Sequence, residues 1–156
     1  MRIILIILWM AGDAYGLAPV ELGQDRINEL AFDFELFEDK SNSLSISEVT
    51  DKGQAFIPSL PGPLNIRYSK SAFWGRFEVD NRSGVAKTLY MVSSVGYVDR
   101  LEVFAPDGLG GFEQSLTGDD IPVNNQTIRE RQAVVSFTAS PGVNRYYFKM
   151  VNKGEG

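Results

Sequence analysis

Aromatic and charged side chains alternate along one stretch of the chain and form its best candidate for binding chemistry. Trp74, Arg76 and Glu78 occupy every second position of a strand-like segment. A strand places such residues on one face. An aromatic ring can stack against the apolar C–H face of a sugar, while arginine and glutamate side chains hydrogen-bond its hydroxyls. The segment therefore predicts a surface that binds a carbohydrate or another small ligand.

Two further segments supply side chains of the same kind. Arg100 and Glu102 alternate in one of them, and Tyr147 and Lys149 alternate in another near the end of the chain. The six candidate ligand-binding residues are Trp74, Arg76, Glu78, Arg100, Glu102 and Tyr147. Tyr147 joins the others, together with Lys149, if its strand lies in the same sheet. The alternative is that Trp74 packs beneath a loop or a short helix and that the charged residues form cross-strand pairs. We favour this alternative, because charged residues are common on exposed sheet faces.

The composition excludes several classes of active site. The 156 residues include no histidine and no cysteine. Catalysis by Ser-His-Asp or Cys-His groups is therefore excluded, as are metal sites that need imidazole or thiolate ligands. Asp119 and Asp120 form a tight acidic pair in a predicted loop, but the spacing around them is not that of a calcium-binding loop. We therefore predict no metal, no cofactor and no enzymatic activity.

Length and charge describe a single domain that does not bind nucleic acid. A chain of this length fits one domain with a substantial core. Its 15 Lys and Arg residues are outnumbered by 20 Asp and Glu residues, which gives a formal charge of −5 at pH 7. Because binding to nucleic-acid phosphates requires a basic patch, and the sequence shows none, nucleic acid is not expected as a partner.

Period-two alternation of apolar residues predicts an all-β domain. Phe73, Gly75, Phe77 and Val79 share the face opposite Trp74. Similar strand-like segments lie at residues 30–36, 86–94, 98–105, 132–138 and 143–152. Turns rich in glycine, proline and asparagine separate them. These six segments are close to the seven or so strands that a β-sandwich contains, so a β-sandwich is predicted.

One short helix is expected between the first and second of these strands. Ser45 and Glu48 have the spacing of a capping box, which predicts a helix at residues 46–52 that ends at Gly53. The polar residues 38–43 before it predict a loop. The segment after it contains three prolines and is expected to be an irregular crossover: Pro58, Pro61 and Pro63.

The N-terminus has the features of an export signal. Arg2 precedes an apolar run at residues 3–10, and small residues that permit cleavage after Gly16 or Ala18 follow. The run is too short to span a bilayer, which requires about 20 apolar residues; the alternative is a short buried strand or helix. We predict a signal peptide at residues 1–18 and an extracytoplasmic domain at residues 19–156. The ending resembles a turn into another strand, so a C-terminal truncation is expected.

The order of these segments resembles a bacterial receptor family. The matching pieces are FELFEDKSNSLSISEV, SAFWGRFEVDN, GYVDRLEVFAPDG, the LTGDDIP loop and RYYFKMVN. They resemble the type 2 extracellular domain of bacterial seven-transmembrane receptors with diverse intracellular signalling modules, over about residues 30–152. This resemblance implies a jelly-roll β-sandwich similar to carbohydrate-binding modules. It supplies no ligand-contact motif that can be transferred residue by residue.

The same resemblance implies a sensory function. The domain would be periplasmic, in a parent protein of the inner membrane whose seven membrane helices connect it to a cytoplasmic output module such as a histidine kinase or diguanylate cyclase. Its ligand would be a carbohydrate or another small molecule. An alternative is a secreted carbohydrate-binding module attached to a glycoside-active enzyme. A glycosidase that uses two carboxylates has no specific support in the sequence.

Overall fold

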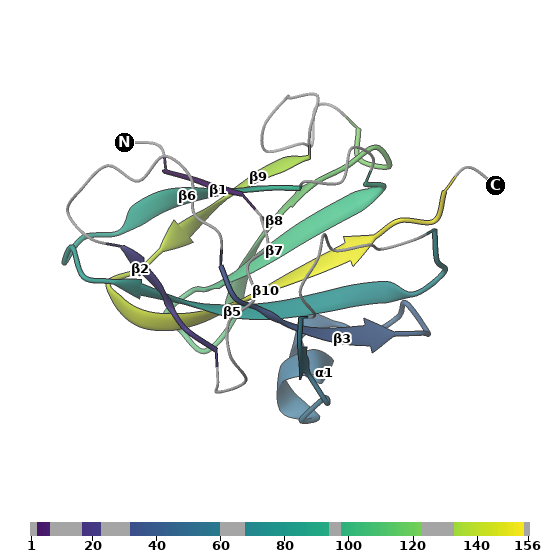
Figure 1. The fold of residues 1–156 in the computed structure, drawn as a ribbon, viewed down its shortest axis with the longest axis horizontal. Coiled ribbons are helices and arrows are strands. Elements are labelled where there is room, and N and C mark those ends of the chain that lie inside the picture. The colour runs from purple at the N-terminus through teal and green to yellow at the C-terminus, as the bar shows by residue number, and fades with distance from the viewer. Residues whose placement is uncertain are drawn as a thin grey trace.

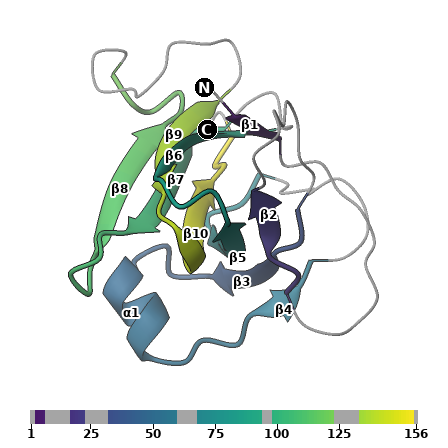
Figure 2. The same cartoon turned by 90° about the vertical axis from the view of Figure 1, so that its left-hand side faces the viewer.

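Two packed β-sheets form the body of the protein (Figures 1 and 2). The structure is a computed structural model that describes residues 3–6, 17–22, 32–59, 68–93, 98–122 and 133–154. Its described part is rich in strands and has one short helix, α1 (Ile46–Asp51). The predicted all-β class with one short helix is therefore confirmed. The jelly-roll arrangement stays a prediction.

The larger sheet carries most of the strands. They are β2 (Val20–Leu22), β3 (Glu35–Asp39), β4 (Ile57–Pro58), β5 (Ala72–Asn81), β7 (Arg100–Pro106), β8 (Phe112–Thr117) and β10 (Gly142–Val151). Their order is β4-β3-β5-β10-β7-β8, and β2 also pairs with β5. The smaller sheet has the order β1-β6-β9 and contains β1 (Ile3–Ile6), β6 (Lys87–Val92) and β9 (Val134–Ala139). The pairs β1–β6 and β2–β5 are parallel, whereas the other pairs are antiparallel.

An apolar core fills the space between the two sheets. Phe77 and Val79 contribute to it from β5, and Leu89 and Met91 contribute from β6; all four are fully buried. Phe77 stacks on Tyr146 of β10 with their ring centroids 5.5 Å apart. The predicted inward face of the central strand is thereby confirmed. This core leaves the opposite face of the larger sheet available for a second cluster.

Helix α1 forms that second cluster on the outer face of the larger sheet. It buries Val49 in a group that includes Trp74, Phe104 and Tyr147. The predicted capping box is present: the Ser45 side chain accepts a hydrogen bond from the backbone N–H of Glu48, and the Glu48 carboxylate accepts one from the backbone N–H of Ser45. A six-residue helix is too short to be stable alone, so the cap and the burial of Val49 hold it in place.

The first predicted strand is displaced toward the C-terminus. The sequence predicts a strand at residues 30–36 and a polar loop at 38–43, but β3 occupies Glu35–Asp39. Phe32 and Phe34 are buried just before it, and residues 30 and 31 lie outside the described part. Asp39 can end a strand while buried because its carboxylate accepts hydrogen bonds from the backbone N–H groups of residues 41, 42 and 44.

Strand β8 has no counterpart among the predicted strands. It lies at the edge of the larger sheet, and most of its residues are exposed or half-buried on both faces. An edge strand of this kind lacks the apolar alternation that identifies half-buried strands. In the predicted crossover, β4 forms one short edge pairing with β3, and residues 60–67 lie outside the described part.

The N-terminal strand β1 falls within the predicted signal peptide. It pairs in parallel with β6, from Ile3 opposite Leu89 to Ile6 opposite Val92. The cleavage of residues 1–18, the domain boundaries and the C-terminal truncation stay predictions. Within the described ranges, no helix is both long and apolar enough to cross a membrane.

Candidate ligand-binding pocket

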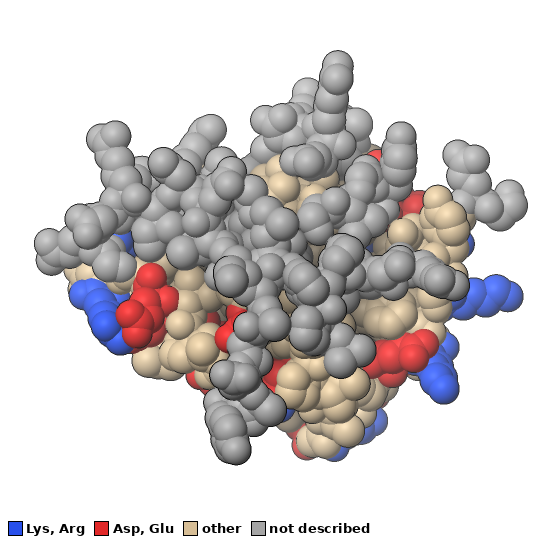
Figure 3. Space-filling model, in the orientation of Figure 1, with Lys and Arg blue, Asp and Glu red and all other residues tan. Residues whose placement is uncertain are grey.

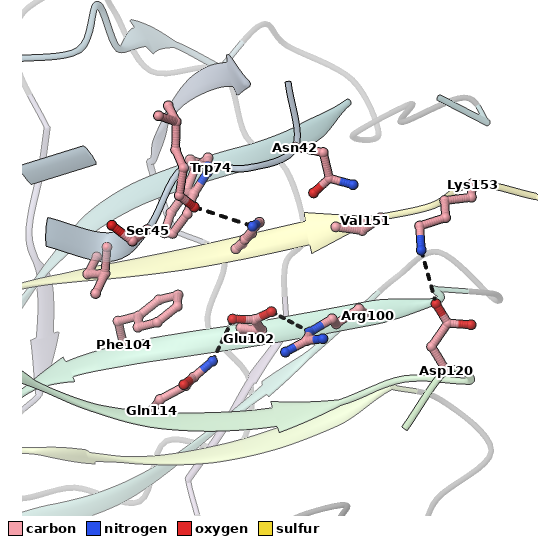
Figure 4. A pocket seen from close by; sticks show the side chains of 13 residues that line it. Asn42, Ser45, Trp74, Arg100, Glu102, Phe104, Gln114, Asp120, Val151 and Lys153 are labelled. Carbon is pink, nitrogen blue, oxygen red and sulfur yellow. Dashed lines mark hydrogen bonds and ion pairs between the residues drawn. The ribbon is translucent and has the colours of Figure 1, made fainter. Parts of the chain in front are cut away.

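A pocket of about 470 Å³ lies on the outer face of the larger sheet, next to α1 (Figure 4). Its floor comes from β5, β10 and β7. The chain before and at the start of α1 forms one wall, and β8 contributes to the opposite wall. The loop after β8 and the end of β10 complete the rim. Sites for small organic ligands commonly have volumes of about 300–1,000 Å³, so this pocket has a suitable size.

The strand order brings the floor residues together. Strand β10 lies between β5 and β7, so Lys149 is opposite Trp74 on one side and opposite Glu102 on the other. Arg100 lies two residues before Glu102 and faces the same way. The strands that carry Trp74, Lys149 and Glu102 therefore lie in one sheet, which is what the predicted combination of these segments requires.

Three of the six predicted ligand-binding residues line the pocket: Trp74, Arg100 and Glu102. Trp74 is only 1% exposed. Its ring stacks on Phe104 with the centroids 5.4 Å apart, and the ammonium of Lys149 lies 5.2 Å from the centroid of the indole ring. The indole therefore presents little surface to solvent. Its N–H has no hydrogen-bond partner among the described residues.

Glu102 is a buried carboxylate held by two partners. It is 5% exposed. One carboxylate oxygen forms an ion pair with the guanidinium of Arg100, and the other accepts a hydrogen bond of 2.6 Å from the amide of Gln114. Figure 4 shows the carboxylate between these two side chains. Pairing of this kind fixes the orientation of a charged group that burial would otherwise destabilise.

The other three predicted residues share the sheet face but do not line the pocket. Arg76 pairs with Glu35 of β3 across the strands and covers the ring of Phe56 at 4.5 Å. Glu78 forms a cross-strand ion pair of 2.7 Å with Arg145. Both contacts are cross-strand charge pairs, which the sequence offers as the alternative to a binding surface. Figure 3 shows the molecule from a different side, and there too acidic and basic side chains lie next to each other on the left and right of the view.

Tyr147 lies beneath α1 with the aromatic cluster. It is 8% exposed, and its ring makes edge contacts with Phe56 and Phe112. This side chain therefore supports the helix and the hairpin between β7 and β8. Tyr147 therefore contributes to the pocket only indirectly, because its ring packs against the elements that form the pocket walls.

The wall formed by the loop before α1 is not evident from the sequence. Asn42 and Leu44 of this loop line the pocket. Asn42 has a φ of 51°, a left-handed conformation that asparagine tolerates better than most residues. The backbone N–H groups of both residues donate to Asp39. The polar run at residues 38–43 was a visible signal for a loop, but it did not reveal the surface that the loop covers.

Asp39 is the acceptor that orders this loop. Burial alone raises the pKa of Asp39, but hydrogen bonds from the Ser41 side chain and from the backbone of Leu44 and Ser41, together with the charge of Lys149, hold it below its ordinary value. The carboxylate therefore stays ionised and continues to accept these hydrogen bonds at neutral pH. A buried group with several donors is well suited to keep one loop conformation.

The rim of the pocket is more exposed than its floor. The ammonium of Lys153 lies 3.5 Å from the carboxylate of Asp120, and both side chains are more than half exposed. The backbone N–H of Lys153 donates to the carboxylate of Asp99. Ion pairs at such exposed positions contribute little to stability, so both rim side chains can reorient toward a ligand.

The pocket offers hydrogen-bonding and apolar groups but no metal ligands in a suitable arrangement. Arg100, Lys149 and Lys153 supply cationic donors, whereas Asn42 and Gln114 supply amides. Within the described ranges, no three Asp, Glu, His or Cys side chains gather closely enough to hold a metal ion. The available chemistry is that of a site for a small polar ligand.

Comparison with known protein families gives the receptor context of this pocket. Residues 32–155 match the family described as 7TMR-DISM extracellular 2. The chain belongs to this family. This 7TMR-DISM extracellular 2 domain is therefore the extracellular, sensory domain of a seven-transmembrane receptor, and its family is one of receptor domains rather than of enzymes. A search of curated proteins found no match to the chain.

Proposed function

We propose that this domain binds a carbohydrate or another small ligand in the pocket beside α1. We further propose that binding is relayed through a parent receptor of the inner membrane to a cytoplasmic output module. The observation that carries the proposal is a pocket, in a receptor sensor domain, that sets apolar side chains such as Leu44 and Phe104 beside a larger number of polar and charged groups. Apolar contact surface and convergent polar groups are both features of small-ligand sites.

The side chains that face the pocket have distinct proposed roles. Leu44 and Phe104 provide apolar surface against which a sugar ring can lie. Asn42 and Gln114 offer amide groups for hydroxyls. The carboxylate of Glu102 is an acceptor already oriented by its two partners. The remaining predicted residues have a supporting role, because their contacts fix α1 and the sheet beneath it: Arg76, Glu78 and Tyr147.

The reading frame downstream of this sequence tests the receptor part of the proposal. A receptor requires seven apolar segments of about 20 residues each, followed by a signalling module. A glycosidase domain in that position would instead support the secreted carbohydrate-binding module. The family match favours the receptor.

Glycan-array binding with a blocked pocket tests the binding site. Gln114→Trp places a large ring at the pocket edge on an exposed strand position, and we expect it to abolish binding. Glu113→Trp is the matched control, because it adds the same ring to the adjacent exposed residue, which does not line the pocket. Equal retention of binding by both folded variants would contradict the proposed site, as would the absence of any bound glycan or other small ligand.

A further inference from the structure

Lys149 is a cationic group of the pocket that forms no ion pair with a carboxylate of the described residues. Its side chain is half-buried on β10. Among the described residues, no carboxylate lies within ion-pairing distance of its ammonium, whereas Arg100 and Lys153 both have such partners. A half-buried ammonium that has no direct ion-pair partner is costly unless other groups compensate it.

The contacts of Lys149 leave some of its N–H donors unused. An ammonium has three N–H donors. One points to the carbonyl oxygen of Leu44 at 3.4 Å, and the indole of Trp74 interacts with the positive charge through its ring. No other acceptor for Lys149 is found in the described part of the chain. Two of its N–H groups therefore remain available to a ligand.

The acidic groups near Lys149 already have other partners. Glu102 lies opposite it on β7, but this carboxylate is bound by Arg100 and Gln114. Asp39 also interacts electrostatically with Lys149, but its oxygens accept hydrogen bonds from the loop before α1. Neither carboxylate is free to approach the ammonium without breaking these bonds.

Lys149 differs from the other two cationic side chains of the pocket. The lining contains Arg100, Lys149 and Lys153 together with the carboxylates of Glu102 and Asp120. Arg100 pairs with Glu102, and Lys153 pairs with Asp120. Among the described residues, Lys149 is therefore the cation of this lining that forms no ion pair, and its charge interacts with Asp39 without direct contact.

We propose that the ligand is an acidic sugar whose carboxylate binds the ammonium of Lys149. This inference rests on the binding function proposed above and names the ligand class for that same pocket. The carboxylate would accept the free N–H donors of Lys149 in a charge-assisted hydrogen bond, which is stronger than a neutral one. The sugar ring would then lie between the loop before α1 and β8.

Matched sugar probes test the requirement for a carboxylate. The probes are glucuronic acid, galacturonic acid and N-acetylneuraminic acid, each compared with its uncharged methyl ester. Trp9 and Trp74 are the two tryptophans of the chain, so a Trp9→Phe variant makes the fluorescence of the pocket residue Trp74 a specific readout. We expect at least one acid to bind about tenfold or more tightly than its ester.

Substitutions at Lys149 test the assigned contact. Lys149→Met keeps an apolar stem over Trp74 but removes the charge, and we expect it to abolish the preference for the acid. Lys149→Arg keeps the charge and should retain most of that preference. Lys52→Met is the matched control on an exposed lysine outside the pocket. Circular dichroism confirms that each variant is folded.

These experiments distinguish a wrong ligand class from a wrong binding site. If esters or neutral sugars bind as tightly as the acids, and Gln114→Trp abolishes this binding, the acidic-sugar inference is wrong and the binding site stands. The inference is also wrong if Lys149→Met preserves the preference for the acid. If no acid binds at millimolar concentration, the acidic-sugar inference is wrong, and a neutral glycan or another small ligand that binds in the pocket preserves the proposed function alone. Both proposals are contradicted if neither the array nor a screen of other small molecules yields a ligand.

Discussion

At the scale of single residues, the pocket is built from side chains that neighbouring groups hold in place. Trp74 lies between an aromatic ring and an ammonium, and Glu102 lies between a guanidinium and an amide. Asp39 binds the backbone of the loop that forms one wall. Side chains held in this way lose little further freedom when a ligand binds.

Removal of the Trp74 side chain should destabilise the fold. If Trp74 were only a surface contact to the ligand, Trp74→Ala would abolish ligand binding and leave the free energy of unfolding unchanged. Because Trp74 is 1% exposed and packs on Phe104, we instead expect a loss of about 3–5 kcal/mol, measured by urea unfolding followed by circular dichroism. Val143→Ala is the control at a residue that is 60% exposed, and it should change stability by less than about 0.5 kcal/mol. An unchanged midpoint in Trp74→Ala would contradict the burial of the indole.

The carboxylate of Asp39 should make the stability of the fold sensitive to acid. Its pKa in the folded protein is below the ordinary value of 3.8. Its stabilisation is therefore fully present above that ordinary value and is lost as the pH falls through the lower folded-state pKa. Asp39→Asn should cost about 1–3 kcal/mol at pH 7, because buried N–H groups lose an acceptor.

Urea unfolding at pH 7 and at pH 2.5 measures this effect. The difference between the native protein and Asp39→Asn should shrink at the acidic pH. Asp51→Asn, at an exposed position at the end of α1, provides the control. A stability difference for Asp39→Asn that stays constant across this range would contradict the proposed role of the ionised carboxylate.

At the scale of elements, β5 and β10 must approach closely for the two faces of the larger sheet to form. Gly75 of β5 lies directly opposite Phe148 of β10. A Cβ atom at Gly75 would lie only 2.0 Å from the Cζ atom of the Phe148 ring. The glycine thus leaves room for a buried aromatic side chain of the inner core, on the face opposite the pocket.

The substitution Gly75→Ala should therefore be destabilising. We expect a cost of about 1–3 kcal/mol from overpacking, measured by urea unfolding. The double variant Gly75→Ala/Phe148→Leu should cost less than the sum of the two single variants, because the smaller side chain relieves the clash. Additive costs would show that the two residues do not interact in this way.

The elements differ in how readily the sequence predicts them. The strands β5, β7 and β10 follow from period-two alternation, and α1 follows from its capping box, because both signals are local. The edge strand β8 lacks such a signal. The pocket depends on the order of strands that are distant in the chain: Trp74 and Lys149 are adjacent only because β10 pairs with β5. No local pattern specifies that pairing.

At the scale of the whole molecule, the two faces of the larger sheet have different roles. The inner face packs against the smaller sheet and buries the core, whereas the outer face carries α1 and the pocket. Ligand contacts can therefore vary without disruption of the core between the sheets. Functions are commonly added to stable folds in this way.

Export should remove the N-terminal segment that contains β1. We expect mass spectrometry of the protein recovered from the periplasm to show a mature N-terminus at Leu17 or Pro19, because the leading residues have the features of a signal peptide. The mature protein would then lack β1, which pairs with β6 by its backbone. An intact Met1 on the exported protein would contradict this prediction and would keep β1 as a strand of the smaller sheet.

The most direct test of the binding pocket is a map of amide chemical shifts in two-dimensional NMR during titration with a ligand found on the glycan array. We expect the shifts to be concentrated in the loop before α1, in the first half of β7, at Gln114 and at the end of β10. Shifts concentrated instead on β6 and β9, with the pocket residues unchanged, would contradict the proposed binding pocket.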